Sequence, residues 1–404
     1  MAGKKNAVVG QSGGPTAVIN QSLVGVIEEV VKSSHIEQLF GARHGVRGIV
    51  NEQFISLRSQ PRDLLEKIAA SPAAALGSTR DKPDAEYCRR IFDCFKKHDI
   101  HYFFYIGGND SADTARIVHD LARQEGYELQ VFHIPKTIDN DLRVHDHCPG
   151  YGSAARYVAA ALIGDNLDNK SLPGVKVNVI MGRNAGFLTA AAVLARQHEQ
   201  DGPHLIYVPE VPLDLSKLLA DVEDVYRRKG RCLIAVSEGV RAPDGRLWNE
   251  KLSDQLDRDM HGNIQLSGTG ALGDFLAHEI RKGLSSAGGK KIRARADTYG
   301  YPQRSFPGFA SEVDAREARL VGRVAVQLSR TSDANGSIAM RRIQNDPYTI
   351  ETFLAPLDAV ARETRQLDAA YIENGNNIRP AFREYAAPLV GPLPEVATFP
   401  EMRD

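Results

Sequence analysis

The sequence has few cysteines and no excess of charge of either sign. Its four cysteines include no C-x-x-C pair and are Cys88, Cys94, Cys148 and Cys232. This pattern argues against a disulfide framework or a zinc site, so we expect reduced, buried thiols and an intracellular setting. The 50 Lys and Arg residues balance 51 Asp and Glu residues, which leaves a formal net charge of −1. No general electric field therefore attracts nucleic acid or an anionic membrane, and we expect neither as a partner.

Long hydrophobic runs are also absent. The longest uncharged stretch, residues 6–27, is interrupted by Gly13, Gly14 and Pro15 and fits a strand, a turn and a helix better than a bilayer span. The N-terminal residues include lysines but no apolar segment before a cleavage site, so we expect no secretory signal. With 42% hydrophobic and 25% charged residues, the composition is that of a soluble globular protein, which we expect in the cytoplasm.

Short apolar runs alternate with amphipathic segments along most of the chain. The expected strands are 6–10, 101–106, 129–134, 176–181, 204–208, 232–236 and 291–296. The expected helices are 17–32, 110–124, 153–167, 185–200, 215–229 and 312–329. This alternation predicts an α/β protein with parallel sheets between layers of helices, in which ligands bind at the carboxyl ends of the strands.

In three other segments the apolar residues show no regular spacing. Residues 143–152 are a candidate crossing between lobes, because they combine proline and glycine with two histidines. Residues 241–265 are polar and read as a surface excursion. The proline-rich C-terminal segment, from about residue 355, is expected to be irregular and to wrap the surface.

Several strand-end loops suit phosphate. Residues 11–16 contain Gly13 and Gly14, whose backbone N–H groups can approach an anion where a helix begins. Arg80 ends a Gly-Ser-Thr-Arg loop, and a guanidinium binds phosphate oxygens in pairs. A third loop, Gly-Gly-Asn-Asp-Ser, contains Asn109 and Asp110. Taken singly, each loop is also consistent with an ordinary turn, an exposed arginine or a helix N-cap.

The loop at 135–141 carries the most chemistry. Lys136, Asp139 and Asp141 follow the expected strand 129–134 within seven residues. The lysine could stabilise a charged transferring group, and the two carboxylates could serve as a general base and a metal ligand. An Asp- and Asn-rich turn is the alternative, but loops that converge from several strand ends favour a site. In the second half, Arg183, Glu238 and the arginines after the last strand suit a sugar phosphate, although each is as consistent with a structural role.

Taken in order, these segments resemble the phosphofructokinase family. Thr-Ile-Asp-Asn-Asp at 137–141 and Met-Gly-Arg at 181–183 carry most of a resemblance that runs from about residue 6 to about residue 330. It implies phosphoryl transfer to the 1-hydroxyl of fructose 6-phosphate with Mg²⁺. It also implies two Rossmann-like three-layer lobes with the active site in the cleft between them.

The resemblance assigns a role to each lobe. The donor lobe, for diphosphate and Mg²⁺, would comprise residues 1–150 plus roughly 305–355. The sugar-phosphate lobe would comprise roughly 151–304 plus 356–404. Because Arg295 is expected to reach the 6-phosphate in a neighbouring subunit's site, the resemblance also implies a homodimer or homotetramer.

Individual residues match the family's functional positions. Asp139 matches the general base, and it is grouped with Lys136, Asp110 and Arg183 as catalytic. The positions matching the sugar-phosphate site are Thr137, Ile138, Asp139, Met181, Gly182, Arg183, Glu238, Arg295, Tyr301, Pro302, Gln303 and Arg304. The diphosphate positions are Gly13, Gly14, Arg80 and Lys136, and the metal positions are Asn109 and Asp141.

Two positions indicate the donor. ATP-using members have glycine where this chain has Asp110 and Lys136. A carboxylate at the first position would repel the α-phosphate of ATP, and a lysine at the second would stabilise charge on the transferring phosphates. Diphosphate is therefore the expected donor. The absence of arginine from helix 17–32 predicts weak or no allosteric control.

Three alternatives remain beside this hypothesis. An ATP-dependent phosphofructokinase is opposed by Asp110. A non-catalytic regulatory subunit is opposed by the presence of both Asp139 and Lys136. A dinucleotide-binding dehydrogenase lobe lacks a G-x-G-x-x-G after its first strand. The chain also departs from the family pattern at Asn109, where an aspartate is more usual, and this implies a metal held with one less charge.

Overall fold

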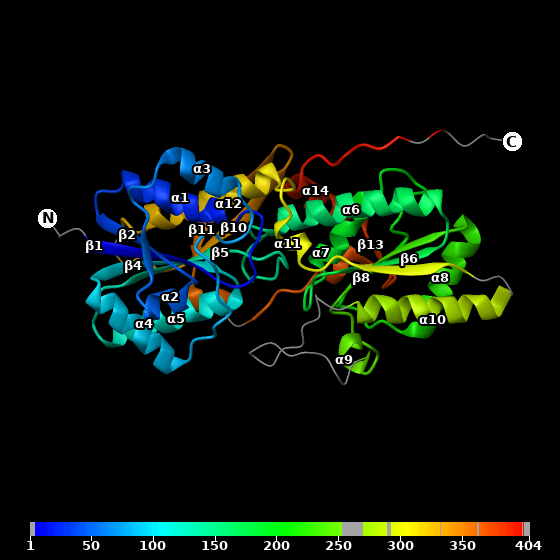
Figure 1. Ribbon diagram of the computed structural model, residues 1–404, viewed down its shortest axis with the longest axis horizontal. Coiled ribbons are helices and arrows are strands. Elements are labelled where there is room, and N and C mark those ends of the chain that lie inside the picture. The colour runs from blue at the N-terminus through cyan, green and yellow to red at the C-terminus, as the bar shows by residue number, and fades with distance from the viewer. Residues whose placement is uncertain are drawn as a thin grey trace. The chain divides into compact units, whose positions relative to one another are not determined.

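The computed structural model describes residues 5–252, 270–288, 292–331, 333–361, 363–397 and 399 (Figure 1). Its contacts divide the chain into two compact units. The first unit comprises Met1–Ala154, Asn184–Leu188 and Tyr301–Leu367, and the second comprises Ala155–Arg183, Thr189–Gly300 and Asp368–Asp404. The roles given to the two lobes from the sequence stay a prediction.

A seven-stranded sheet, ordered β11-β10-β5-β4-β1-β2-β3, forms the middle of the first unit. Its strands are β1 (Lys5–Gln11), β2 (Ile36–Ala42), β3 (Phe54–Ser56), β4 (Ile100–Gly107), β5 (Gln130–Pro135), β10 (Gly336–Asn345) and β11 (Tyr348–Ala355). Strands β1, β4 and β5 are adjacent and parallel, with Gln11 opposite Ile106 and Gly107 opposite Pro135. Their carboxyl ends therefore lie at one edge, where the loops after them meet.

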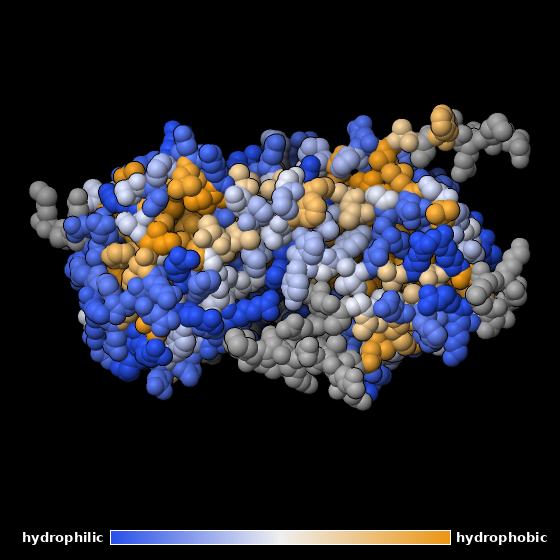
Figure 2. Space-filling model, in the orientation of Figure 1, coloured by the Kyte–Doolittle hydropathy of each residue, from blue (hydrophilic) through white to orange (hydrophobic). Residues whose placement is uncertain are grey.

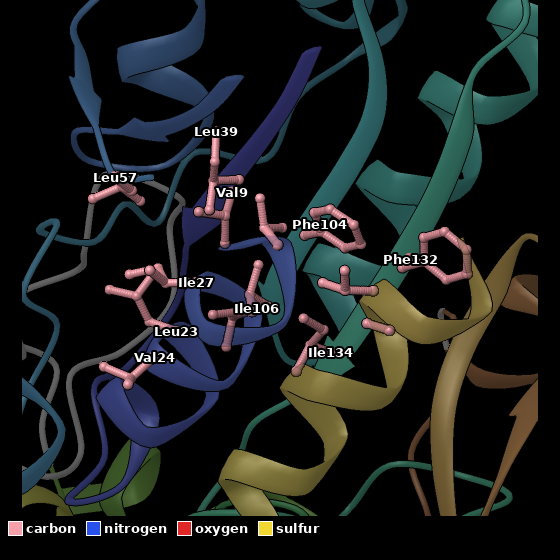
Figure 3. Close-up of a cluster of buried hydrophobic side chains, with 14 of the residues drawn as sticks. Val9, Leu23, Val24, Ile27, Leu39, Leu57, Phe104, Ile106, Phe132 and Ile134 are labelled. Carbon is pink, nitrogen blue, oxygen red and sulfur yellow. The ribbon is translucent and has the colours of Figure 1, made fainter. Parts of the chain in front are cut away.

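Helices cover both faces of this sheet. They are α1 (Ile19–Lys32), α2 (Val46–Val50), α3 (Arg62–Ala70), α4 (Ala85–Lys97), α5 (Asn109–Gln124), α12 (Glu312–Leu328) and α13 (Leu357–Val360). The short helix α11 (Pro302–Ser305) also belongs to this unit. Side chains alternate across each strand, so Val9 and Phe104 pack under α1, α3 and α12 (Figure 3), whereas Val8 and Phe103 pack against α2, α4 and α5. The predicted three-layer α/β architecture is confirmed here.

Glycines let α1 and α12 touch through their backbones. A Cβ on Gly25 would lie 2.2 Å from the backbone oxygen of Arg319, and one on Gly322 would lie 2.2 Å from that of Ser22. Two ion pairs flank the crossing, since Arg323 binds Glu28 at 2.7 Å and Arg330 binds Glu29 at 3.0 Å. This crossing closes one face of the first unit.

Gly25→Ala is expected to lower the free energy of unfolding by about 2–3 kcal/mol, because the added methyl group overpacks a backbone contact that has no room for it. Urea unfolding followed by circular dichroism measures the change. Gly164→Ala is the matched control, since a Cβ on that helical glycine meets nothing within 4 Å. An equal effect of both substitutions would contradict the role given to the crossing.

The second unit has a four-stranded parallel sheet ordered β7-β8-β6-β9. Its elements are α6 (Tyr151–Ser171, which begins in the first unit), β6 (Val175–Ile180), β7 (Leu205–Tyr207), α8 (Leu215–Lys229), β8 (Cys232–Ser237), α9 (Trp248–Leu252), α10 (Ala271–Gly288), β9 (Ala294–Thr298), β12 (Ile372–Glu373), β13 (Asn377–Ile378) and α14 (Pro380–Val390). Ile180 lies opposite Ser237 and Val179 opposite Thr298, so β6, β8 and β9 also end at one edge.

Two sequence expectations about regular structure are wrong. The helix expected at 185–200 is only α7 (Phe187–Ala190) followed by a 3-10 turn (Ala191–Ala195), because the Asp201 carboxylate accepts hydrogen bonds from the backbone of Gln197 and His198 and holds them in a loop. The C-terminal segment is not wholly irregular. It forms α14, which starts at Pro380, where the missing N–H costs nothing, and which buries Phe382 and Leu389.

The polar segment 241–265 lies only partly within the described residues. Residues 243–246 form an exposed turn, whereas α9 follows it and buries the side chain of Trp248, which donates to the backbone oxygen of Leu213 at 2.9 Å. The expected surface excursion is therefore found at residues 243–246 but not at the start of α9, which is buried. Residues 253–265 lie outside the described residues, as does residue 291 of the strand expected at 291–296.

The cysteine prediction is confirmed, since Cys88, Cys94, Cys148 and Cys232 are free and buried. Burial raises the pKa of Cys88 and of Cys148 to about 12, so both thiols are unreactive at neutral pH. Within the described ranges, no helix combines the length and the apolar character needed to cross a bilayer. The face drawn in Figure 2 is mostly hydrophilic, with hydrophobic residues in separate patches.

Candidate functional site

The glycine loop after β1 is fastened to the loop that carries Arg80. Gly13 has a φ of +73°, a conformation that glycine adopts at little cost. Its backbone N–H donates to the oxygen of Thr79 at 2.8 Å, and the Ser78 hydroxyl donates to the oxygen of Gly13 at 2.6 Å. Two loops far apart in sequence are thereby joined at the edge where β1 and β4 end.

Lys136 reaches across this edge to the glycine loop. It follows β5 directly, and its backbone N–H donates to the oxygen of Gly107 at 2.9 Å. Its Nζ donates to the oxygen of Gly14 at 2.7 Å, although the residue is only 4% exposed. A Cβ on Gly13 would lie 3.0 Å from this Nζ, so glycine leaves the room that the ammonium group occupies.

Arg304 approaches the same loop from α11. A Cβ on Gly14 would lie 2.6 Å from Nη1 of Arg304, so the guanidinium rests against the glycine backbone. The guanidinium also stacks on Tyr301, with its Cζ 4.6 Å from the ring centroid. Two cations and two glycines therefore converge on one small region, which suits a compact polyanion.

The surroundings of Lys136 weaken its hold on its proton. Burial and, to a smaller extent, the charge of Arg304 lower the pKa of the ammonium group to about 7, against the opposing effect of Asp139 and Asp141. A desolvated cation of this kind gains strongly from an anion placed beside it. The lysine is thus prepared to bind a phosphate and not to pair permanently with a carboxylate.

Thr137 links two parts of the carboxylate loop, residues 137–141. The backbone N–H of Asp139 donates to Oγ1 of Thr137 at 3.0 Å, and Thr137 in turn donates to the Asp141 carboxylate at 3.2 Å. Asn140 has a φ of +59°, and its buried amide oxygen accepts from the backbone of Cys148 at 3.0 Å. The side chain of Ile138 is buried.

Asn109 and Asp141 meet, although 32 residues separate them. The amide Nδ2 of Asn109 donates to the Asp141 carboxylate at 3.3 Å. Burial raises the pKa of Asp141, against the lowering effect of its bond to Thr137. The Oδ1 of Asn109 is buried without a hydrogen-bond partner among the described residues. One carboxylate beside one orphaned amide oxygen fits Mg²⁺, which takes its other ligands from water and substrate phosphates.

No set of three or more His, Cys, Asp or Glu side chains suited to a metal occurs in the part of the chain that the structure describes. Such a set would suit a transition metal. The Asn109–Asp141 pair differs from it in using a carboxylate and an amide oxygen, which are hard ligands.

Asp110 lies in the first turn of α5 and faces a lysine that sequence reasoning missed. Its carboxylate lies 3.3 Å from Nζ of Lys82, and both side chains are more than half exposed to solvent. Lys82 follows Arg80 by two residues in an irregular loop, and nothing in the local pattern connects it with α5. Only the adjacency of the two loops reveals the pair.

The second unit gathers the other predicted residues at the carboxyl edge of its own sheet. Gly182 has a φ of +132°, and its oxygen accepts from the hydroxyl of Ser237 at 2.6 Å. Glu238 is buried, and its backbone N–H donates to the oxygen of Ile180 at 2.8 Å. A Cβ on Gly239 would lie 2.1 Å from the oxygen of Arg183, so these two strand ends are in contact. Met181 precedes Gly182 at this edge.

Arg295 is placed differently from these residues. It lies on β9, an edge strand, where its side chain is exposed. Its neighbour in register is Lys176, which binds Asp165 at 2.6 Å and Asp297 at 2.8 Å and is therefore occupied within the unit. On α11 of the first unit, Gln303 is buried beside Pro302, whereas Tyr301 is 39% exposed.

Comparisons with known proteins identify the family of the chain. The family model described as Phosphofructokinase matches residues 6–329. A protein of Rhodospirillum rubrum named pyrophosphate–fructose 6-phosphate 1-phosphotransferase is 51% identical over 389 residues, which are 96% of this chain and 95% of that protein. A protein of the same name from Halomonas elongata is 38% identical over 95% of this chain and 91% of its own length.

A solved structure is also similar. The pyrophosphate-dependent phosphofructokinase of Marinobacter aquaeolei has a TM-score of 0.83 and 32% sequence identity, and the match covers 99% of this chain and 94% of that one. The family model spans more than half of the chain, and the matched relatives align with it over nearly their full lengths. On these grounds, and with the converging loops described above, the chain belongs to the phosphofructokinase family.

Proposed function

We propose that this protein transfers a phosphoryl group reversibly from diphosphate to the 1-hydroxyl of fructose 6-phosphate, giving fructose 1,6-bisphosphate and phosphate. The observation that carries the proposal is the buried ammonium group of Lys136, 2.7 Å from the oxygen of Gly14 on the phosphate-suited loop. The relative that is 51% identical over most of the chain bears the name of this activity.

Asp139 acts as the general base in this proposal. It takes the proton from the sugar 1-hydroxyl, which makes the oxygen nucleophilic toward the terminal phosphorus of diphosphate. The bond from its backbone N–H to Thr137 fixes the turn that presents the carboxylate. In the reverse direction the same carboxyl group returns the proton.

Lys136 and Arg304 stabilise the transferring group. Phosphoryl transfer depends mainly on positioning and on compensation of charge at the phosphate oxygens. The two cations lie beside Gly13 and Gly14, whose backbones leave space for phosphate oxygens. Asn109 and Asp141 would hold Mg²⁺, which supplies further positive charge to the diphosphate when it is bound.

Asp110 selects the donor. A carboxylate at the start of α5 would lie where a nucleotide's α-phosphate must pass, and the two negative charges repel one another. An ATP-dependent enzyme is disfavoured for this reason. A non-catalytic regulatory subunit is disfavoured because Asp139 and Lys136 are both present.

The proposal assigns sugar-phosphate binding to several residues outside the carboxylate loop. Arg183 and Glu238, together with Met181 and Gly182, would contact the sugar from the second unit. The exposed Arg295 would complete the site of a neighbouring subunit, so we propose a homodimer or homotetramer. The four buried thiols are consistent with a reducing, cytoplasmic setting.

Initial rates with fructose 6-phosphate and Mg²⁺ test the function, with either diphosphate or ATP as the only donor. Turnover with diphosphate alone supports the proposal. Turnover with ATP alone would overturn the donor assignment while leaving phosphoryl transfer intact. The absence of turnover with both donors would favour the regulatory subunit.

Asp110→Gly is expected to raise kcat/KM with ATP by at least about tenfold, because a like charge facing the nucleotide is removed. Rates with ATP and with diphosphate are measured on the same preparation. Asp113→Gly is the matched control, since it replaces another aspartate of α5 by glycine, one turn further along the helix. Asp113 is paired with Arg116. A gain in both variants, or in neither, would argue against selection by Asp110.

A further inference from the structure

The carboxylate loop is held by an arginine from the far end of the first unit. Arg365 follows Asn140 by 225 residues, yet its Nη2 donates to the backbone oxygen of Asn140 at 2.8 Å. Its own backbone N–H donates to the oxygen of Asp141 at 2.7 Å. One residue therefore binds two successive peptide oxygens, those of the proposed metal ligand Asp141 and of Asn140, which follows the proposed base.

The same guanidinium continues along the segment that follows the loop. Its Nη1 donates to the backbone oxygens of His145 at 2.5 Å and Asp146 at 2.9 Å. Its Cζ lies 4.6 Å from the ring centroid of Phe187, which supports the planar group from one side. Together with the bonds to Asn140 and Asp141, Arg365 donates to four backbone carbonyl groups and thereby fixes residues 140–146.

We propose that Arg365 is a positioning residue for the phosphoryl transfer, because it fixes the backbone from which Asp139 and Asp141 project. This inference rests on the proposed function. The loop needs such a support, since Asn140 has a φ of +59° and two carboxylates stand two residues apart. Without an external partner, strain and like-charge repulsion would favour other conformations.

An arginine suits this task better than a lysine. Its planar fork offers five N–H donors in fixed directions, so that it can bind three carbonyl groups at once while its face lies on an aromatic ring. A lysine keeps the charge but has a single ammonium group at the end of a flexible chain. The two side chains should therefore differ in how well they hold the loop.

The kinetic consequence differs from that of simple destabilisation. If Arg365 positions Asp139, its loss should lower kcat much more than it changes the KM for either substrate, because small displacements of a base affect the reaction more than binding. If Arg365 only supports the fold, the folded fraction of a variant should turn over at the rate of the wild type.

Steady-state rates of wild type, Arg365→Ala and Arg365→Lys decide between these possibilities, with thermal unfolding measured in parallel. We expect kcat to fall about 100-fold in Arg365→Ala and about 10-fold in Arg365→Lys, with both KM values within about threefold of wild type. Arg58→Ala is the matched control. Arg58 lies in the same unit and donates to the backbone oxygens of Ser33 and Ile36, but it does not touch the carboxylate loop.

A wild-type kcat in Arg365→Ala, or an equal loss in Arg58→Ala, would overturn the inference while leaving the proposed function in place. An inactive wild type would instead remove the proposed function and the inference with it. If Arg365→Ala fails to fold, Arg365→Lys decides, since a lowered kcat at unchanged KM supports the role and an unchanged kcat refutes it.

Discussion

Asp139→Asn is expected to lower kcat by about three to four orders of magnitude, because an amide cannot take the proton from the sugar hydroxyl. The substitution keeps the shape of the side chain, and the backbone bond from residue 139 to Thr137 stays possible. Binding of fructose 6-phosphate should therefore change by less than about threefold. Initial rates in both directions, with calorimetry for binding, measure the two quantities.

The control for this variant is Asp93→Asn, which changes an exposed aspartate on α4 in the same way. It should leave kcat unaltered. Near-normal turnover in Asp139→Asn would mean that another group accepts the proton. A loss of sugar-phosphate binding equal to the loss in rate would instead assign Asp139 to binding.

Lys136→Met is expected to lower kcat by roughly two to three orders of magnitude, as the loss of a preorganised charge at a transition state does. The methionine preserves most of the side-chain volume but removes the ammonium group from the oxygen of Gly14. Because the pKa of Lys136 is about 7 in the free protein, kcat/KM for diphosphate should fall as pH rises above about 7. The residual activity of the variant should not show this decrease with pH.

The same substitution should stabilise the ligand-free protein at low pH. The pKa of Lys136 falls from 10.5 to about 7 on folding, so the folded protein carries a buried charge below about pH 7. The free-energy cost of burying this charge is relieved as pH rises from about 7 to 10.5. Lys136→Met should therefore raise the free energy of unfolding by about 2 kcal/mol at pH 6, and by less at pH 9. A gain independent of pH would show that the ammonium group is not desolvated.

The local sequence pattern was sufficient to predict the positions of the strand-end loops. The alternation of Phe103 and Phe104 between two cores is a property of any strand, and the glycines after β1 and β4 mark sharp turns wherever they occur. For this reason β1, β4, β5 and α8 lie close to where the sequence placed them. The prediction of a helix at 185–200 was wrong because the Asp201 carboxylate binds the backbone N–H groups of Gln197 and His198. The spacing of apolar residues gives no sign of this competition.

Contacts between distant segments lay beyond sequence reasoning. The pair Lys82–Asp110 joins an irregular loop to a helix start, and Arg365 reaches Asn140 across 225 residues. The sequence around Lys82 and around Arg365 does not distinguish them from ordinary exposed charged residues. Their partners are backbone or side-chain oxygens brought near by packing of whole elements, so the signal is spatial and not periodic.

By itself the sequence determined the alternating α/β architecture, the glycine loops and the carboxylate loop, because these depend on backbone preferences and on side-chain periods within a few residues. The tertiary structure alone decided that Lys136 loses its solvent and contacts Gly14, that Asn109 meets Asp141, and that the end of the first unit supports the carboxylate loop. Burial and hydrogen bonding between remote segments arise only when the sheet brings its strand ends to one edge.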